Sequence, residues 1–292
     1  VGRSRMSIPS YEGPPAHRVA LEKRLRNICD ALDLNELRTR TSLAHTVIAQ
    51  LLPMGVVKGG AAIKFRTGDH ASRVTRDLDA TRGADHTVET YAAELSAHLA
   101  DGWQGFTGRL VDRTPADPPD VPGEYVMHPF EVKLAYAGQS YVTIEFELGH
   151  DEVGSTAAPA LALDAGIAEV IERLGFPTPE PVAVLAVEHQ IAQKLHACTT
   201  PNRQGGNERA HDLVDLQILV GVDPPDLREL ARIGRRLFAA RRVSPWPPEV
   251  REWPGWDDRY LAASEGLDVR PLDSAVQWLQ ALVDEAEQTS AG

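Results

Sequence analysis

Two aspartates, Asp77 and Asp79, stand one residue apart in the segment RVTRDLDA. The segment 73–81 is expected to form a strand, on which side chains two residues apart point to the same face. Two like charges at this spacing repel unless a cation lies between them or a proton is shared. A hard divalent cation such as Mg²⁺ or Mn²⁺ takes carboxylate and phosphate oxygens as ligands. The pair therefore predicts a metal site, and the alternative is two solvated carboxylates on an edge strand.

A glycine pair, Gly59 and Gly60, lies upstream of the aspartates and directly follows a short apolar run that ends at Lys58. A short helix is expected to begin near Ala61. Glycines after a strand let backbone N–H groups approach phosphates closely, and the N-terminus of the following helix attracts an anion. The turn therefore indicates a phosphate site, although an ordinary surface turn would also use these residues.

Further carboxylates occur in the strand pattern YVTIEFELG, where Glu145 and Glu147 again share one face. One of them could be a third ligand beside the aspartate pair. The alternative is the polar outer face that alternation in an antiparallel strand produces by itself.

Two helical patterns in the second half of the chain combine charges with apolar residues. VEHQIAQKLHA contains Lys194, and RAHDLVDL contains Asp212 and Asp215, which are three apart and so share a helix face. A lysine with apolar neighbours is expected to meet an anion. A triphosphate and a buried carboxylate such as Asp212 are both candidates for that anion.

Hydrophobic periodicity divides the chain into a mixed first part and a helical second part. Strands are expected at 106–112, 129–137 and 140–149, with a hairpin connection around Gly138. Helices are expected at 14–32, 35–52, 87–101, 160–175, 187–198, 208–220, 225–241 and 273–288. The Pro- and Trp-rich segment 244–260 is expected to be irregular. The predicted fold class is α+β, with a first domain at 6–175, a linker at 176–181 and a helical C-terminal domain at 182–292.

Composition and charge narrow the class of protein. The 292 residues, 42% hydrophobic and 25% charged, are typical of a globular chain. No apolar run is long enough to span a membrane, and no signal peptide is recognisable, so a cytoplasmic location is expected. Residues 1–5 are interpreted as a vector remnant before Met6. Cys29 and Cys198 form no metal or disulfide pattern, and the net charge of −12 disfavours stable binding to DNA.

Taken together, the segments KGGAAIKFR, RVTRDLDA, EHQIAQKLHAC and RAHDLVDL resemble the AbiEii/AbiGii toxin family of nucleotidyltransferase-like proteins, and within it the mycobacterial MenT branch. The resemblance implies a polymerase-β-type nucleotidyltransferase core at 6–175, followed by the helical C-terminal domain. Family members are toxins of toxin–antitoxin modules, which implies a cognate antitoxin as partner. Some mycobacterial members add nucleotides to the 3′ end of tRNA, which blocks aminoacylation.

The resemblance also implies roles for individual positions in the first domain. The glycine turn that holds the triphosphate falls on Gly59 and Gly60, and the pair that holds the metal falls on Asp77 and Asp79. The third aspartate usual in polymerase-β-type enzymes would be replaced by a longer side chain, either Glu145 or Glu147.

In the second domain, the lysine and the aspartate that the family requires for activity fall on Lys194 and Asp212, with Lys194 placed to neutralise phosphate charge. Two further cations, Lys58 before the glycine turn and Arg76 before the first aspartate, are placed to touch phosphates. Either could equally be a structural ion-pair partner.

Arginines are concentrated in the helical pattern 225–241. Those at three- and four-residue steps share one helix face, and they are Arg228, Arg232, Arg235 and Arg236. This face could hold the phosphates of an RNA acceptor stem. A solvated face opposite an apolar stripe and a docking face for the antitoxin are the alternatives.

Three tryptophans, Trp246, Trp253 and Trp256, follow the arginine-rich segment and could stack bases. Their proline-rich surroundings favour the other interpretation, in which they pin an irregular segment to the body of the protein.

The predicted function is that of an enzyme toxin, which transfers a nucleoside monophosphate from an NTP to an RNA acceptor, expected to be the tRNA 3′ end, and so blocks translation. One alternative keeps the chemistry but changes the acceptor to a small molecule or a protein hydroxyl. Another is a non-catalytic binding module with a degenerate core. The arginine-rich face favours RNA, and the intact aspartate pair favours catalysis.

Overall fold

The computed structural model describes residues 8–68, 71–115 and 126–291, and the expected vector remnant at 1–5 lies outside these ranges. The chain forms two compact units. Unit 1 takes the described parts of 1–69, 74–150 and 161–184, and unit 2 takes those of 70–73, 151–160 and 185–292. The final passage from unit 1 to unit 2 falls after Val184, a few residues beyond the linker expected at 176–181.

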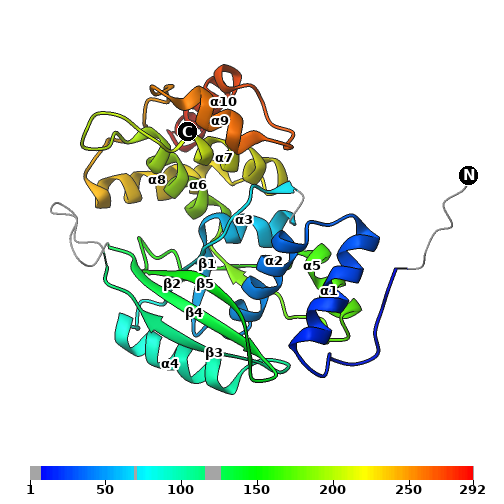
Figure 1. Ribbon diagram of the computed structural model, residues 1–292. Helices are drawn as coiled ribbons and strands as arrows, with labels where there is room; N and C mark the ends of the chain where they lie inside the picture. The colour runs from blue at the N-terminus through cyan, green and yellow to red at the C-terminus, as the bar shows by residue number, and fades with distance from the viewer. Residues whose placement is uncertain (1–7, 69–70, 116–125, 292) are drawn as a thin grey trace, which may run out of the picture. The chain divides into compact units, whose positions relative to one another are not determined.

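Unit 1 is built around a mixed sheet, which has seven strands in the described ranges, in the order β3-β4-β5-β2-β1-β7-β6 (Figure 1). The strands are β1 (Gly55–Lys58), β2 (Leu78–Arg82), β3 (Phe106–Asp112), β4 (His128–Tyr136), β5 (Gln139–Gly149), β6 (Ala160–Ala162) and β7 (Val182–Val184). Neighbouring strands β3, β4 and β5 run antiparallel, β2 runs parallel to β5, and β1 runs antiparallel to β2.

The meander of β3, β4 and β5 confirms the three strands expected from period-two patterning. Along β4, buried and half-buried residues alternate, as a sheet with one face on a core requires. The β4–β5 turn is made by Ala137 and Gly138, whose φ angles are 48° and 74°. Two consecutive residues at positive φ are the hallmark of the tight turn that matches the twist of a hairpin.

The helices of unit 1 are α1 (Arg18–Leu32), α2 (Glu36–Ala49), α3 (Gly59–Thr67), α4 (Val88–Asp101) and α5 (Ala165–Arg173). Figure 1 shows α4 on one side of the sheet, along β3, and α1, α2 and α5 grouped together on the other. Side-chain oxygens cap several helix starts: Asn35 accepts from an N–H of α2, and Thr87 forms a capping box at α4.

Five elements differ from the sequence-based expectation. The helix expected at 160–175 begins only at Ala165, because Asp164 caps it, and β6 precedes it. Strand β7 lies just beyond the linker expected at 176–181, where no strand was predicted. The strand expected at 73–81 is only β2, from Leu78. The segment 244–260, expected to be irregular, contains the start of helix α9 (Trp256–Ser264), with Gly255 as its N-cap.

Unit 2 is helical, and the α+β fold class is thereby confirmed for the chain. Its helices are α6 (Val187–Thr199), α7 (Ala210–Val222), α8 (Leu227–Arg241), α9 and α10 (Leu272–Ala291). Helix α6 packs on α7 and α8, α8 packs on α10, and α7 packs on α9. No helix in the described ranges is long and apolar enough to cross a membrane.

Two of the three tryptophans in the segment 244–260 are part of this helical core. Trp253 and Trp256 are buried, and their indole N–H groups donate to the carbonyls of Cys198 and Asn207. They pin the 244–256 segment to α6 and to the loop before α7, as the surrounding prolines favoured.

Candidate functional site

The glycine turn is pressed against the second aspartate of the pair. Strand β1 ends at Lys58, which is paired with Asp79 in the antiparallel register, and the chain then turns into α3. Gly59 has φ +63°, and a Cβ there would lie 2.0 Å from Oδ2 of Asp79. Both the left-handed backbone and this contact require glycine at position 59, so the backbone of the turn lies directly against a carboxylate.

The second glycine of the turn is equally constrained. A Cβ on Gly60 would lie 2.2 Å from Oγ1 of Thr75, a residue that is itself buried. The turn is thus packed between β2 and the segment that leads into β2. At this contact the buried Thr75 hydroxyl forms no hydrogen bond with a described residue.

Asp77 and Asp79 do not lie on one strand, which corrects the sequence-based expectation. Only Asp79 is in β2, where it is half-buried, while Asp77 lies in an exposed bend immediately before the strand. The reason is the register: β1 stops at Lys58, opposite Asp79, so residue 77 has no partner on that side. The two carboxylates remain one residue apart at the end of the strand nearest the glycine turn.

The register also distinguishes the two candidate third carboxylates. In the parallel pairing of β2 with β5, Glu147 is the direct partner of Asp79, whereas Glu145 lies opposite Glu131 of β4 and is exposed. Glu147 is therefore the strand neighbour of Asp79. No group of three His, Cys, Asp or Glu side chains in the described ranges is close enough to hold a metal ion by itself.

The cations expected beside the turn lie in different environments. Lys58 is half-buried; its Nζ is 3.2 Å from Sδ of Met127, and it covers Gly149 at the end of β5, where a Cβ would approach Nζ to 2.6 Å. Arg76 has an exposed side chain. Its carbonyl oxygen accepts a hydrogen bond from Nε2 of His45 in α2, at 3.3 Å. That bond anchors the backbone directly before Asp77.

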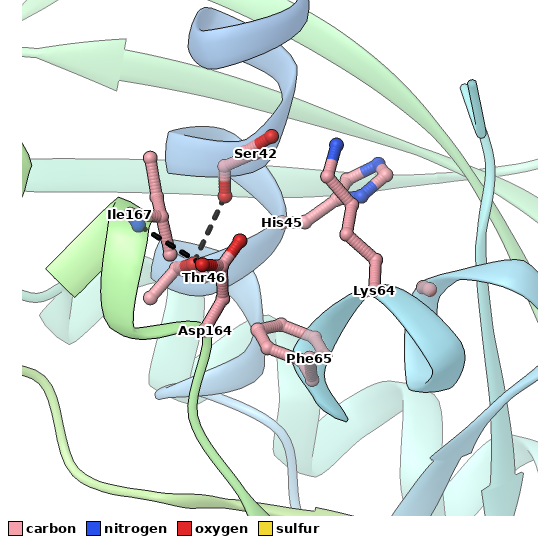
Figure 2. Close-up of a pocket in the computed structure, with 8 residues that line it drawn as sticks. Ser42, His45, Thr46, Lys64, Phe65, Asp164 and Ile167 are labelled. Carbon is pink, nitrogen blue, oxygen red and sulfur yellow. Dashed lines mark hydrogen bonds between the residues drawn. The ribbon is translucent and has the colours of Figure 1, made fainter. Parts of the chain in front are cut away.

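A small cavity lined by both polar and apolar residues lies between α2, α3 and the start of α5 (Figure 2). The centre of a water molecule can range over about 10 Å³ there, which is room for about one water. His45, Lys64 and Asp164 are buried residues of its lining. Asp164 Oδ1 accepts hydrogen bonds from the N–H groups of Gly166 and Ile167, so this carboxylate caps the N-terminus of α5.

In unit 2, Lys194 is held by two carboxylates. Its Nζ donates to Asp212 Oδ1 and to Asp215 Oδ2, both at 2.7 Å, and all three side chains are buried. Burial alone would lower the pKa of Lys194, but the charges of Asp212 and Asp215 outweigh it and raise this pKa. Burial likewise opposes ionisation of Asp212, yet the positive charge of Lys194 leaves the pKa of Asp212 lowered. Lys194 and Asp212 are therefore both charged at neutral pH. Of the two anions expected for Lys194, a triphosphate and a buried carboxylate, the structure shows the carboxylate.

The cluster extends to Arg73, the first residue of the segment RVTRDLDA and a residue to which no role was assigned from the sequence. Arg73 Nε lies 2.9 Å and 3.0 Å from the two carboxylate oxygens of Asp215. Asp215 thus bonds both Lys194 and Arg73, and Arg73 lies 142 positions before it in the sequence. The three-residue spacing of Asp212 and Asp215 was visible in the sequence, whereas no role was predicted for Arg73 or for His45.

The arginine-rich face of α8 is partly paired. Arg232 forms an ion pair with Glu229, and Arg235 forms one with Glu287 of α10 at 2.8 Å. Arg228 and Arg236 are exposed, and neither side chain forms an ion pair with another described residue. Two of the four guanidinium groups, those of Arg232 and Arg235, are thus ion-paired, and those of Arg228 and Arg236 are not.

The candidate site in unit 1 combines groups that favour anions with groups that favour cations. Unit 1 brings together a strand-to-helix turn of two glycines, two adjacent aspartates, a strand-neighbouring glutamate and two cations. Backbone N–H groups at a helix start favour a phosphate, and adjacent carboxylates favour a hard cation.

The family follows from comparison with known proteins. Residues 42–284 match the family model described as nucleotidyl transferase AbiEii toxin, type IV toxin–antitoxin system. Because the match spans most of the chain, the protein belongs to the AbiEii nucleotidyltransferase toxin family. A search of curated proteins gave no significant match.

One solved structure agrees with this fold, and a second aligns more weakly. MenT4, a nucleotidyltransferase toxin from Mycobacterium tuberculosis H37Rv, aligns with TM-score 0.50 and 15% identity over 94% of this chain and 98% of that one. A protein from H. pylori, provisionally described as a nucleotidyltransferase, aligns with TM-score 0.44 and 14% identity over 87% of this chain and 96% of that one. At this level of identity the first similarity supports the fold alone, and the second is too weak to add to it.

Proposed function

We propose that the protein transfers a nucleoside monophosphate from an NTP to the 3′ end of an RNA, with tRNA as the acceptor, and so blocks translation until an antitoxin neutralises it. Membership of the toxin family supports the reaction class. The observation that carries the proposal is the contact between the glycine turn and Asp79, since a Cβ at Gly59 would lie 2.0 Å from that carboxylate.

The described residues suit a divalent cation, Mg²⁺ or Mn²⁺. Asp77 and Asp79 would hold it, with Glu147 as the neighbour on β5. Mg²⁺ is commonly bound by one or two carboxylates, with water and substrate phosphates completing its shell, so the absence of a ready-made cluster of three ligands among the described residues is compatible with it. When bound, such a cation neutralises phosphate charge and lowers the pKa of a coordinated hydroxyl.

The residues of the chain itself bind and orient the two substrates. The N–H groups of the Gly59–Gly60 turn and the start of α3 donate to the terminal phosphates. Lys58 and Arg76 contribute positive charge beside them. An RNA 3′ oxygen then forms a bond to the α-phosphorus, the bond from that phosphorus to the β-phosphate bridge breaks, and pyrophosphate leaves.

Lys194 and Asp212 are proposed to be required for activity as well. The motif resemblance implies this role, and the structure adds that both belong to one buried charged cluster with Asp215. Exposed Arg228 and Arg236 on α8, together with Arg232 and Arg235, are proposed to attract the phosphates of the RNA.

The test is an acceptor comparison. Purified protein is incubated with Mg²⁺, each α-labelled NTP and one of three acceptor preparations: total tRNA, the same tRNA oxidised with periodate to destroy its 3′ diol, and a tRNA-free cell lysate. We expect label in intact tRNA alone. Label in periodate-treated tRNA would contradict the 3′ end as acceptor, and label only in the tRNA-free lysate would move the function to a protein or small-molecule hydroxyl.

A further inference from the structure

A groove on unit 2 lies where α8 ends and the chain enters the proline-rich segment. Its volume is about 510 Å³, within the range of small-molecule sites. Its lining combines aromatic, aliphatic and cationic side chains from positions 235–246, chiefly Arg235, Phe238, Arg242, Val243 and Trp246. None of these residues belongs to the site around Asp79.

Trp246 forms a rigid wall of this groove. A Cβ at Gly234 of α8 would lie 2.2 Å from the indole ring, so the ring packs directly on the helix backbone. Its edge meets Phe238 at a centroid distance of 5.4 Å, and its Nε1 donates to Glu287 at 2.8 Å. A glycine inside a helix costs stability. The close packing of the indole ring on the backbone explains why residue 234 is nevertheless a glycine. Unlike buried Trp253 and Trp256, Trp246 is half-exposed.

The charge of the groove is positive in a chain of net charge −12. Arg235 shares the carboxylate of Glu287 with Trp246. Arg242, the C-cap of α8, is exposed, and its side chain makes no hydrogen bond or ion pair with any residue that the structure describes. Beside it Val243 is 60% exposed. The groove therefore has a guanidinium group without an ion pair, that of Arg242, next to an exposed apolar side chain.

We propose that this groove binds one nucleotide of a single-stranded RNA segment, with the base against Trp246 and Val243 and a phosphate on Arg242. Fixed aromatic rings beside arginines are how proteins hold single-stranded nucleic acid without reading its sequence. A protein partner would cover Val243 equally well, but it would have to bring an acidic group for Arg242. A nucleotide supplies the negative charge and the flat apolar ring in one unit. The inference rests on the proposed function in assuming that RNA is the acceptor.

The test measures binding of a short fluorescent single-stranded RNA to the full chain by anisotropy, at several salt concentrations. Arg242→Ala removes the cation, and Arg109→Ala on β3, equally exposed, is its matched control. Val243→Glu places a negative charge in the groove, and Val222→Glu, at a residue 53% exposed in the same unit, controls for that change. Melting curves confirm that each variant is folded.

We expect both groove variants to weaken binding about five-fold or more, and Arg242→Ala to flatten the salt dependence by about 0.7 in log–log slope, the value for one phosphate contact on a single strand. Both controls should bind as the wild type does. Groove variants that bind RNA like the wild type would overturn the inference. So would an equal loss in the controls.

A separate transfer assay distinguishes this inference from the proposed function. If the wild type binds RNA through the groove but labels no acceptor, the transferase proposal fails and the groove remains. If both groove variants label tRNA at wild-type rates and bind RNA as the wild type does, the groove inference fails and the transferase remains.

Discussion

At the scale of single residues, two separate constraints require glycine at position 59: the backbone conformation and the contact with Asp79. Its φ of +63° would alone favour glycine. The second constraint concerns the site itself, because a Cβ at this position would approach Asp79 Oδ2 to 2.0 Å. Any side chain here would displace the carboxylate that we propose as a metal ligand.

A first prediction separates these two constraints. Gly59→Ala should abolish most of the nucleotide transfer, because the new methyl group displaces the Asp79 carboxylate. Gly138→Ala is the matched control, since Gly138 has φ +74° but no atom within 4 Å of the added Cβ. Both variants should lose about 1–2 kcal/mol of unfolding free energy from backbone strain, as measured by urea denaturation. Equal activities in the two variants would show that the contact with Asp79 is irrelevant.

Lys194 gives a second prediction at this scale. Lys194→Met leaves Asp212 buried without its cation and Asp215 with Arg73 as its remaining cation, and breaking a buried pair from one side costs about 3–5 kcal/mol. Adding Asp212→Asn should restore part of that loss, because it removes the carboxylate that has lost Lys194. Lys133→Met, which removes an exposed partner of Glu131, should change the unfolding free energy by less than about 1 kcal/mol. A Lys194→Met protein as stable as the Lys133 variant would contradict the charged state inferred for the cluster.

Some site residues could be found from the sequence and others could not. The glycine pair and the aspartates were visible because their spacing is local. The choice between Glu145 and Glu147 needed the β2–β5 register, since both share a face of the strand. Arg73 meets Asp215 only through the tertiary fold, so no short-range pattern could have indicated it.

At the scale of elements, unit 2 is held together around His196. Glu152, in the segment 151–160, accepts hydrogen bonds from Arg241 at the end of α8 and from Gln193 of α6. His196 of α6 accepts from Arg241 at 3.2 Å and packs against Phe238. Burial, and after it the charge of Arg241, lowers the pKa of His196 to about 4.

This environment predicts a pH dependence of stability. His196 stays neutral in the folded protein down to about pH 4 but is protonated below about pH 6.5 when unfolded. Its contribution is therefore complete above pH 6.5 and is lost as the pH falls toward 4. Between pH 7.5 and 5 the wild type should lose about 2 kcal/mol more unfolding free energy than His196→Asn, measured by urea denaturation. Parallel pH profiles for the two proteins would refute the lowered pKa.

Element prediction succeeded where patterns were long and failed where they were short. Strands β4 and β5 have nine and eleven residues, long enough for alternation along part of each to establish a period of two. Strands β6 and β7 have three residues each, too few to show any period. Helix α9 was missed because prolines before Trp256 suggested an irregular segment, whereas the helix starts directly after them.

At the scale of the whole molecule, the chain combines a sheet unit that carries the proposed phosphate site with a helical unit that has a locally basic face. The net charge of −12 means that any binding to RNA must come from a local surface. We therefore expect RNA affinity to fall steeply with salt, in proportion to the phosphates contacted. Substituting both uncommitted arginines of α8, Arg228 and Arg236, by Ala should lower the affinity and the salt slope together. An affinity independent of salt would contradict an electrostatic acceptor surface.

The central claim is that the site formed by Gly59, Asp77 and Asp79 transfers a nucleoside monophosphate to RNA. The most direct measurement supplies tRNA with an NTP labelled either at the α- or at the γ-phosphate, using wild type and Asp79→Asn. The account predicts that α-label alone enters tRNA, with one pyrophosphate released per nucleotide added, and that Asp79→Asn transfers none. Entry of γ-label, or equal transfer by Asp79→Asn, would contradict it.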